Sequence, residues 1–290
     1  MTYDLVIGDR AYSSWSLRGW LLLDAFGLPV NTHSVRLYTD ELATLLRDYV
    51  PARTAPTMRT PDGTVIPETI AIAEELATRH PDAGVWPTDP RARATARVLA
   101  AEMHAGFTAL RNHCPMNLRV SYTGCQPPDA VLADLARLET LWSSARQTTG
   151  STTPWLCGAY SAADAFFAPV AARIAGYNLP VRPDAMLYVN AHLAHPSFRR
   201  WRAMGMVDGA DQDHYRRDYP RRDWPGPVRL PARAVAGPTA ENATCPYSGK
   251  PVTHALELYG RRFGFCNALC RDKTVADAEA WPKFMAIYHS

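Results

Sequence analysis

Two serines near the N-terminus stand where a bound anion could be held. Ser13 and Ser14 lie in a polar stretch between an expected strand at residues 3–7 and an expected helix at residues 15–26. The first turn of a helix has N–H groups without partners and carries the positive end of the helix dipole, so it stabilises an anion such as a thiolate. The alternative is that Ser13 or Ser14 only caps the helix.

Two further segments in the first eighty residues could bind a ligand that extends away from those serines. Ala55 precedes Pro56, and a proline just before a strand can hold a cis bond that exposes the preceding backbone for pairing. Glu68 and Thr69 open another expected helix. There a carboxylate could bind an ammonium group, while a hydroxyl and free N–H groups bind a carboxylate. Glu68 and Thr69 together therefore suit an α-amino acid head group. The alternative is that they form an ordinary helix cap.

The cysteines are concentrated at the other end of the chain. Three of the six, Cys245, Cys266 and Cys270, fall in the last fifty residues. The sequence does not begin with a basic segment followed by an apolar stretch, so no secretory signal is expected and the cytoplasm is the predicted location. Thiols stay reduced in that compartment, and crowded cysteines then indicate metal binding or redox chemistry before disulfides.

The elements expected around these residues divide the chain into four parts. Residues 1–82 alternate strand and helix signals in the order β-α-β-α-β-β-α, which predicts a mixed sheet with helices packed on it. Residues 90–206 show only helical patterns, and one long helix is expected over residues 91–112. Residues 207–243, rich in proline and arginine, are expected to form a linker or an extended surface arm. Residues 244–290 contain the three clustered cysteines.

The order of the motifs resembles the glutathione S-transferase family. The N-terminal motifs are Ser-Ser-x-Ser-x-Arg from Ser13, Ala-Pro-Thr from Ala55 and Glu-Thr-x-Ala-Ile from Glu68. In the helical part, the stretch that ends in Ser161 and Asp164 is similar to a family motif whose physics is a capping box, so both residues are expected to be structural. The resemblance implies a thioredoxin-like α/β glutathione-binding domain followed by an all-helical substrate domain.

The same resemblance implies a chemistry and a set of site residues. The expected reaction conjugates the glutathione thiol to an electrophilic small molecule, in a homodimer. The implied glutathione site has Ser13 at the thiolate with Ser14 as the close alternative, Ala55 and Pro56 at the cysteinyl backbone, and Glu68 and Thr69 at the γ-glutamyl head group. The alternatives are a zeta-like glutathione-dependent isomerase or lyase, although Trp15 replaces the zeta-type cysteine, and a non-catalytic adaptor of the same fold.

The helical domain is expected to supply the pocket for the second substrate. The candidates lie on its first long helix and just after it: His104, Phe107, Arg111, His113, Cys114 and Arg119. His113 and Cys114 are neighbours in sequence, but adjacent residues on a helix do not face each other, so a joint nucleophilic role is disfavoured.

Residues 244–288 resemble the small treble-clef zinc domains of the YHS/TRASH type. The carrying features are Cys-Pro-Tyr-Ser-Gly from Cys245 and a Tyr-Gly segment that runs into Cys266 and Cys270. The resemblance implies zinc bound by these three cysteines. Ser248 stands where the second zinc cysteine belongs, and His254, His289 or water could complete the four ligands that a structural zinc needs. The alternative is a metal-free module that is held by aromatic packing.

Composition sets the outer limits of these hypotheses. The 290 residues are 47% hydrophobic and 20% charged, which excludes a disordered or fibrous protein. A net charge of +3 is too small to indicate nucleic acid as a partner. No run of about 18 apolar residues is present, so a membrane is not an expected partner either.

Overall fold

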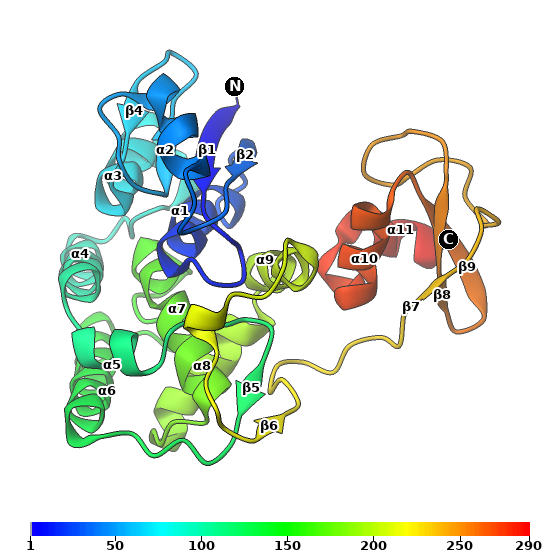
Figure 1. Ribbon diagram of the computed structural model, residues 1–290. Helices are drawn as coiled ribbons and strands as arrows, with labels where there is room; N and C mark the ends of the chain where they lie inside the picture. Colours follow the sequence, from blue (N-terminus) through cyan, green and yellow to red (C-terminus); the bar gives the residue numbers. More distant parts are fainter. Residues whose placement is uncertain (1) are drawn as a thin grey trace.

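The computed structural model describes residues 2–290 and begins with a sheet that has helices on both faces (Figure 1). Its elements are β1 (Tyr3–Ile7), α1 (Ser14–Asp24), β2 (Val30–Ser34), α2 (Glu41–Leu45), the 3-10 helix η1 (Leu46–Tyr49), β3 (Thr57–Arg59), β4 (Val65–Ile66) and α3 (Thr69–Arg79). The strands lie in the order β2-β1-β3-β4, with β1 and β2 parallel and the other neighbours antiparallel. The predicted order β-α-β-α-β-β-α is confirmed.

The alternation of side chains along β1 explains how both faces of the sheet are covered. Leu5 and Ile7 point to one face, where they join the buried cluster that includes α1 and α3. Val6 points to the opposite face and packs against Leu46 and Tyr49 of η1. These side chains are all at most 4% exposed, so burial fixes the register of the strand.

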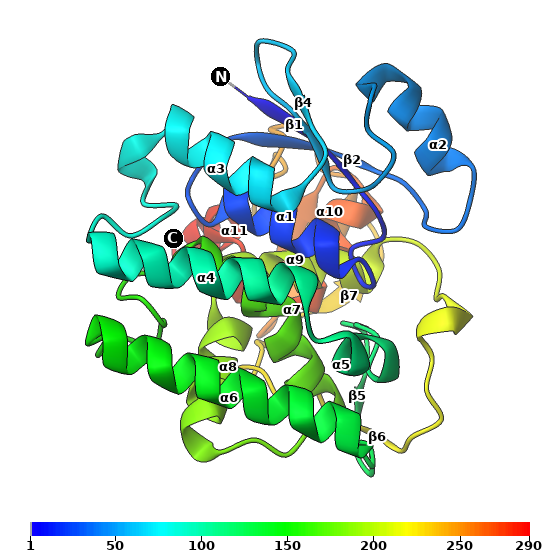
Figure 2. The ribbon, with the colours of Figure 1, turned by 90° about the vertical axis from the view of Figure 1, so that its left-hand side faces the viewer.

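The second part of the chain is a helical bundle built around one buried helix. Its elements are α4 (Pro90–Ala105), α5 (Thr108–His113), a short strand β5 (Ser121–Tyr122), α6 (Asp129–Thr149), α7 (Ala162–Tyr177), α8 (Pro183–Ala194) and α9 (Pro196–Val207). Every residue of α7 is buried, and α1, α4 and α8 pack against it. Figure 2 shows α4 and α6 side by side across the front of this bundle. Within residues 2–290, no helix has both the length and the apolar character that crossing a bilayer requires.

The single long helix expected over residues 91–112 is two helices, so that prediction was wrong. Between α4 and α5, Gly106 takes an extended backbone and Phe107 takes a left-handed one at φ 63°. A Cβ at Gly106 would lie 2.9 Å from the carbonyl oxygen of Glu102, so glycine suits this turn. The turn also buries the Phe107 ring, which is 6% exposed. Helical periodicity continues through the turn, and the sequence pattern therefore hides it.

The N-terminus of α7 is fixed by a capping box around a buried carboxylate. Asp164 accepts hydrogen bonds from the backbone N–H of Ser161 at 2.9 Å and from its hydroxyl at 3.1 Å. The Tyr188 hydroxyl donates to the same carboxylate at 2.8 Å, and the Leu156 N–H donates at 3.3 Å. The capping box expected for Ser161 and Asp164 is confirmed, and four donors compensate the burial of the charge.

Residues 207–243 follow the surface as an arm with short paired segments. The arm contains the 3-10 turn η3 (Asp213–Tyr215) and β6 (Arg221–Arg222), which pairs with β5. Arg119 anchors its start through hydrogen bonds to the carbonyls of Gly205 and Asp208. The arm therefore lies against both earlier parts of the chain before it crosses to the C-terminal part (Figure 1).

The C-terminal part is a three-stranded antiparallel sheet covered by helices. Its elements are β7 (Arg233–Val235), β8 (His254–Leu258), β9 (Arg261–Phe265), α10 (Ala268–Ala276), the 3-10 turn η4 (Ala278–Ala280) and α11 (Pro282–Tyr288). Because β7 pairs with β8, this sheet begins within the segment expected to be a linker. The unit docks on α9, where Ala203 joins its core and Arg199 binds both carboxylate oxygens of Asp277 at 2.7 and 2.9 Å.

A buried histidine on α8 predicts how stability depends on pH. Burial lowers the pKa of His192 to about 3, and the ring lies edge-on to the aromatic rings of Trp155 and Tyr188. The unfolded chain protonates this residue below about pH 6.5, whereas the folded chain keeps it neutral, so stability falls as the pH falls from 6.5 towards 3. We expect His192→Phe to reduce the slope of unfolding free energy against pH by about 1.4 kcal/mol per unit between roughly pH 6 and 4.

Urea unfolding at a series of pH values measures this slope. The matched control is His289→Phe, which replaces an exposed histidine near the C-terminus and should leave the slope unchanged. Equal slopes for the native chain and His192→Phe would contradict the assignment.

Candidate functional site

The N-terminus of α1 is organised by three serines. Ser13 is the N-cap: its hydroxyl oxygen accepts from the Ser16 N–H at 3.2 Å, and its proton is donated to the Ser16 hydroxyl at 2.7 Å. The Ser16 hydroxyl in turn accepts from the Gly8 N–H at 3.0 Å. Ser13 is 7% exposed, so its hydroxyl is largely committed to holding the turn between β1 and α1.

Ser14 is the first residue of α1 and has a freer hydroxyl. Its oxygen lies 3.5 Å from a guanidinium nitrogen of Arg173 on α7. Among residues 2–290, no acceptor lies within hydrogen-bond distance of its proton. Both Ser13 and Ser14 line a hollow of about 550 Å³ between the sheet domain and the helical bundle. The structure therefore places both predicted serines at one cavity, with different hydrogen bonding.

A second hollow of about 350 Å³ adjoins the first and contains the other predicted ligand-binding residues. Ala55, Pro56, Glu68 and Thr69 all line it, and the Ala55–Pro56 peptide is cis. Trp15 and Ala55 belong to the lining of both hollows, so the two cavities meet there. The six residues expected to form one extended ligand site are thus brought together along a continuous depression.

His104 lies in this second hollow rather than in the pocket expected for another substrate. Its Nε2 is 3.7 Å from a Glu68 carboxylate oxygen, and its Nδ1 is 3.5 Å from the Thr69 hydroxyl. Burial and the positive charge of Arg18 lower the pKa of His104, although Glu68 opposes this shift. The neutral imidazole is therefore favoured, and its Nδ1 is within hydrogen-bond reach of the Thr69 hydroxyl, whereas the Glu68 carboxylate lies beyond that reach.

Trp15 rests on arginines that have no acidic partner in contact. Arg18 is 1% exposed, its guanidinium lies 4.6 Å from the Trp15 ring centroid, and two of its nitrogens have no partner among residues 2–290. Arg111 lies 4.9 Å from the same ring. Burial, together with Arg111 and Arg173, lowers the pKa of Arg18 well below its usual range. Crowded cations without counter-ions make this region attract an anion.

The larger hollow has a basic and aromatic lining. Arg111 and Arg173 contribute two guanidinium groups, and among residues 2–290 no acidic side chain lines this cavity. Its outer side is closed by the arm, where Tyr215 stacks on Tyr12 at 4.7 Å between ring centroids. The Tyr215 hydroxyl also lies 3.1 Å from that of Tyr38.

The other residues expected in the second-substrate pocket have mixed positions. Arg111 lines the larger hollow, whereas Phe107 and Cys114 are buried in the core and Arg119 holds the arm. Burial raises the pKa of the Cys114 thiol to about 12, so it is not a nucleophile at neutral pH.

Sequence reasoning missed two prominent residues of the larger hollow. Arg173 lies inside the buried helix α7, and Tyr215 lies on an arm that was expected to have no role in the site. An arginine in a helix with no other charged residue beyond Asp164 was the signal available for Arg173. No sequence signal identifies Tyr215, because its place depends on the path of the arm.

The three C-terminal cysteines converge at the turn that precedes β8. The sulfurs of Cys245, Cys266 and Cys270 all lie within 4.8 Å of one another, and those of Cys266 and Cys270 are 3.9 Å apart. Burial raises the pKa of Cys245, but the backbone amides of Cys266, Tyr247 and Ser248 oppose it, and the resulting pKa is about 6.

The expected fourth ligand position is occupied by a hydroxyl. Ser248 donates to the Cys266 sulfur at 3.2 Å. Among residues 2–290, neither His254 nor His289 belongs to this group of adjacent ligand atoms. His254 instead lies with its Nδ1 2.9 Å from the Thr253 hydroxyl.

Comparison with known proteins gives this geometry a family context. Residues 12–79 match the glutathione S-transferase N-terminal domain family. A probable maleylacetoacetate isomerase of Caenorhabditis elegans is 36% identical over 103 residues, which are 36% of this chain and 47% of that protein. The chain therefore matches about half the length of this curated relative.

Solved structures of similar fold cover both N-terminal parts of the chain. A glutathione transferase homologue from Burkholderia GL BGR1, solved with bound glutathione, is 24% identical with a TM-score of 0.52, over 71% of this chain and 98% of that one. A maleylacetoacetate isomerase from Anaeromyxobacter dehalogenans 2CP-1, also with glutathione bound, is 24% identical with a TM-score of 0.50, over 69% and 94%. The chain thus has the glutathione transferase fold, a thioredoxin-like domain followed by a helical domain, and residues 12–79 are similar to the glutathione S-transferase N-terminal domain.

Proposed function

We propose that the chain is a glutathione-dependent enzyme that conjugates the glutathione thiol to an electrophilic small molecule. The observation that carries this proposal is the continuous pair of hollows that meet at Trp15 and Ala55. One end offers a carboxylate and a helix N-terminus for the γ-glutamyl head group, at Glu68 and Thr69. The other end offers the N-terminus of α1 for the sulfur. The relatives solved with glutathione share this fold and support the proposal.

The reaction follows from the electrostatics at α1. A free thiol has a pKa near 8.5, and a hydroxyl donor together with a helix dipole lowers it by roughly one to two units. The thiol proton leaves to solvent, and the thiolate attacks an electrophilic carbon in the larger hollow. A carbon–sulfur bond forms, and a leaving group departs with its electron pair. The unpaired positive charges of Arg18, Arg111 and Arg173 stabilise the thiolate further.

The hydrogen bonding at the helix start favours Ser14 as the donor to the thiolate. Ser13 already gives its proton to Ser16 and caps α1, whereas the Ser14 proton is free to turn towards a ligand. Ser13 thereby holds the N–H groups of α1 in place. This reverses the order that the family resemblance implied for the two residues.

The character of the larger hollow favours an anionic second substrate. Its lining has Arg111 and Arg173 and no acid, and it lies next to the proposed thiolate. The second candidate is an isomerase that adds the glutathione thiol to an unsaturated acid and then eliminates glutathione again. Such a reaction would use the same arginines and the same helix start, and it would regenerate the thiol. The worm relative named as a maleylacetoacetate isomerase supports this second candidate, while Trp15 at the zeta-type cysteine position argues for a different reaction. The homodimer and the cytoplasmic location stay predictions.

Alanine substitutions at the two serines test the assignment. We expect Ser14→Ala to lower kcat/KM by roughly 10- to 100-fold, because a charge-assisted hydrogen bond contributes about 1.5–3 kcal/mol. The unfolding free energy should change by less than about 0.5 kcal/mol. Ser13→Ala should instead lose about 1 kcal/mol of stability, because a helix cap is removed. Activity with a model aryl halide, the ultraviolet absorption of bound thiolate and urea unfolding give the three readouts.

Two results would contradict parts of this scheme. Full activity in Ser14→Ala together with an inactive but stable Ser13→Ala would identify Ser13 as the hydrogen-bond donor to the thiolate. No binding to immobilised glutathione by the native chain, with no turnover of the aryl halide, would favour the non-catalytic adaptor.

We also propose that the C-terminal part is a treble-clef module that binds zinc. Its support is the convergence of three sulfurs, with Cys245 in a turn stabilised by backbone amides and Cys270 in the first turn of α10. Cys245, Cys266 and Cys270 would hold the ion, which would supply cross-linking of the turn to the helix. A unit of this size has little core of its own, so such a cross-link would add substantially to its stability.

Metal analysis tests this site directly. We expect zinc bound to the native chain to fall by one equivalent in Cys266→Ser, and the thermal midpoint of the C-terminal part to fall with it. Cys157→Ala is the matched control, because Cys157 is buried far from this turn in sequence and lies outside the group. Equal amounts of bound zinc in the native chain and in Cys266→Ser would contradict the zinc site and favour a metal-free module that is held by aromatic packing.

A further inference from the structure

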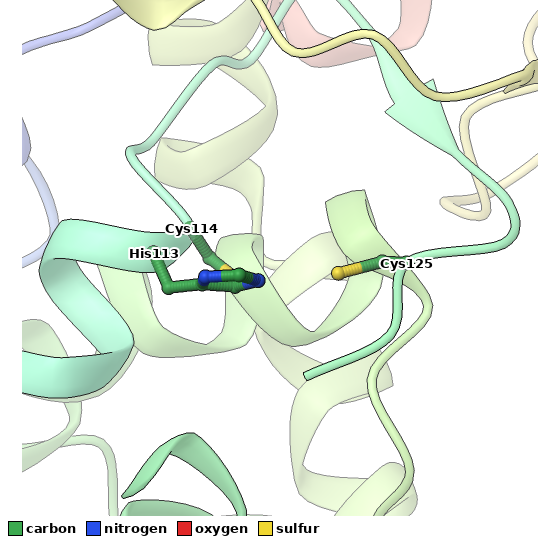
Figure 3. A group of neighbouring side chains, drawn as sticks. All are labelled: His113, Cys114 and Cys125. Carbon is green, nitrogen blue, oxygen red and sulfur yellow. The ribbon is translucent and has the colours of Figure 1, made fainter. Parts of the chain in front are cut away.

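A second group of metal-binding side chains lies in the helical bundle, away from the C-terminal cysteines. His113, Cys114 and Cys125 each offer a ligand atom, and these three atoms lie within 4.8 Å of one another. Figure 3 shows the His113 ring in front of Cys114, with the Cys125 thiol pointing towards both from the opposite side. Cys125 comes from the loop after β5, so two separate segments of the chain contribute.

The end of α5 explains why two sequence neighbours point to the same place. His113 is the last residue of α5, and Cys114 is its C-cap, with φ −115° and ψ 70°. Cys114 has therefore left the helix, and the rule that adjacent helical side chains diverge does not apply to it. The two side chains therefore meet although they are sequence neighbours, so the geometric premise used against a joint role does not hold at this position.

One ring nitrogen of the group lacks a hydrogen-bond partner. His113 Nε2 is buried and has no hydrogen-bond partner among residues 2–290. A buried ring nitrogen without a partner costs free energy, and a bound ion would supply that partner. The Cys114 carbonyl is bound by Arg173 Nε at 2.9 Å, which fixes the backbone next to the thiol. The surrounding arm covers the group, since Arg217 donates to the Tyr122 hydroxyl and to the Asn112 carbonyl.

We propose that His113, Cys114 and Cys125 form a binding site for a zinc ion, distinct from the C-terminal cysteine site. Zinc takes thiolate at about 2.3 Å and imidazole at about 2.0–2.1 Å, so tetrahedral ligand atoms lie roughly 3.5–3.8 Å apart. Ligand atoms within 4.8 Å of one another need to close by about 1.3 Å at most. Binding releases one proton from each thiol to solvent and gives a neutral complex of two thiolates, one imidazole and the dication, with water as the fourth ligand.

The ion would join α5 to the segment that follows β5. Asn112, Pro115 and Met116, which flank His113 and Cys114, line the larger hollow. A cross-link at this point would fix the wall of that hollow behind its lining residues. The role is structural, and it does not depend on the glutathione chemistry proposed above.

Thiol labelling with peptide-level detection separates this site from the C-terminal one. The full chain is stripped with a chelator, reloaded with zinc sulfate alone, and labelled with N-ethylmaleimide. Cys125 is half-buried and can react when the metal is absent. We expect zinc to slow its labelling by at least about tenfold, because a thiolate bound to zinc is no longer a free nucleophile. Unchanged labelling of Cys125 overturns the proposal.

Variants give an independent readout. Cys125→Ala should lower bound zinc by one equivalent per chain, and His113→Gln, at a half-buried position, should weaken zinc binding while the fold is kept. Cobalt substitution reports the same site, because the difference spectrum between the native chain and Cys125→Ala should contain thiolate-to-cobalt charge transfer. Cys157→Ala is the control and should retain all the zinc. A Cys114–Cys125 disulfide in place of bound metal, found by mass spectrometry of the unreduced chain, also overturns the proposal.

Discussion

The burial of Asp164 is the constraint on which the rest of the structure depends. A carboxylate with no exposure survives in the core only because four donors surround it, and all four come from segments that meet at the start of α7. Breaking this set would leave an unpaired charge in the core and release the N-terminus of the central helix. The helices α1 and α4, which contribute residues to the two hollows, both pack on α7. Their positions therefore depend on the capping box that fixes the start of α7.

Beyond its N-terminus, α7 also positions charged groups at the site. Phe166 lies two residues after Asp164, and the Arg18 guanidinium is 5.4 Å from its ring centroid. Arg173 follows two turns later, where it reaches both Ser14 and the Cys114 carbonyl. Burial disfavours each of these charges, and their mutual repulsion adds to that cost. The arrangement is stable only because packing in the core outweighs it, and a bound anion would relieve it.

The sequence identifies the parts of this protein that depend on local chemistry. Helix starts at Ser13 and Ser161 are visible because caps need particular residue types, and the order of strands and helices along the first domain follows from alternating patterns. The turn at Gly106 escapes prediction, since one glycine is compatible with a helix and only the left-handed Phe107 shows the break. The position of His104 beside Glu68 was equally hidden, because it depends on how two domains pack. Contacts between segments that are distant in the chain are hard to predict from a single sequence.

The arm, residues 207–243, is the segment whose role differs most from what its sequence predicts. A proline-rich stretch of balanced charge is typical of a linker, yet its side chains complete the larger hollow at Tyr215 and bind Asp9 through Gln212 at 2.6 Å. The same segment then supplies β7 to the C-terminal sheet, and that sheet is held on α9 by Arg199 and Asp277. The arm is thus restrained at both ends, by the site at its start and by the cysteine module at its end. The pairing of β6 with β5 holds the arm between these ends, and Tyr215 thereby keeps its place in the aromatic wall that faces the proposed substrate.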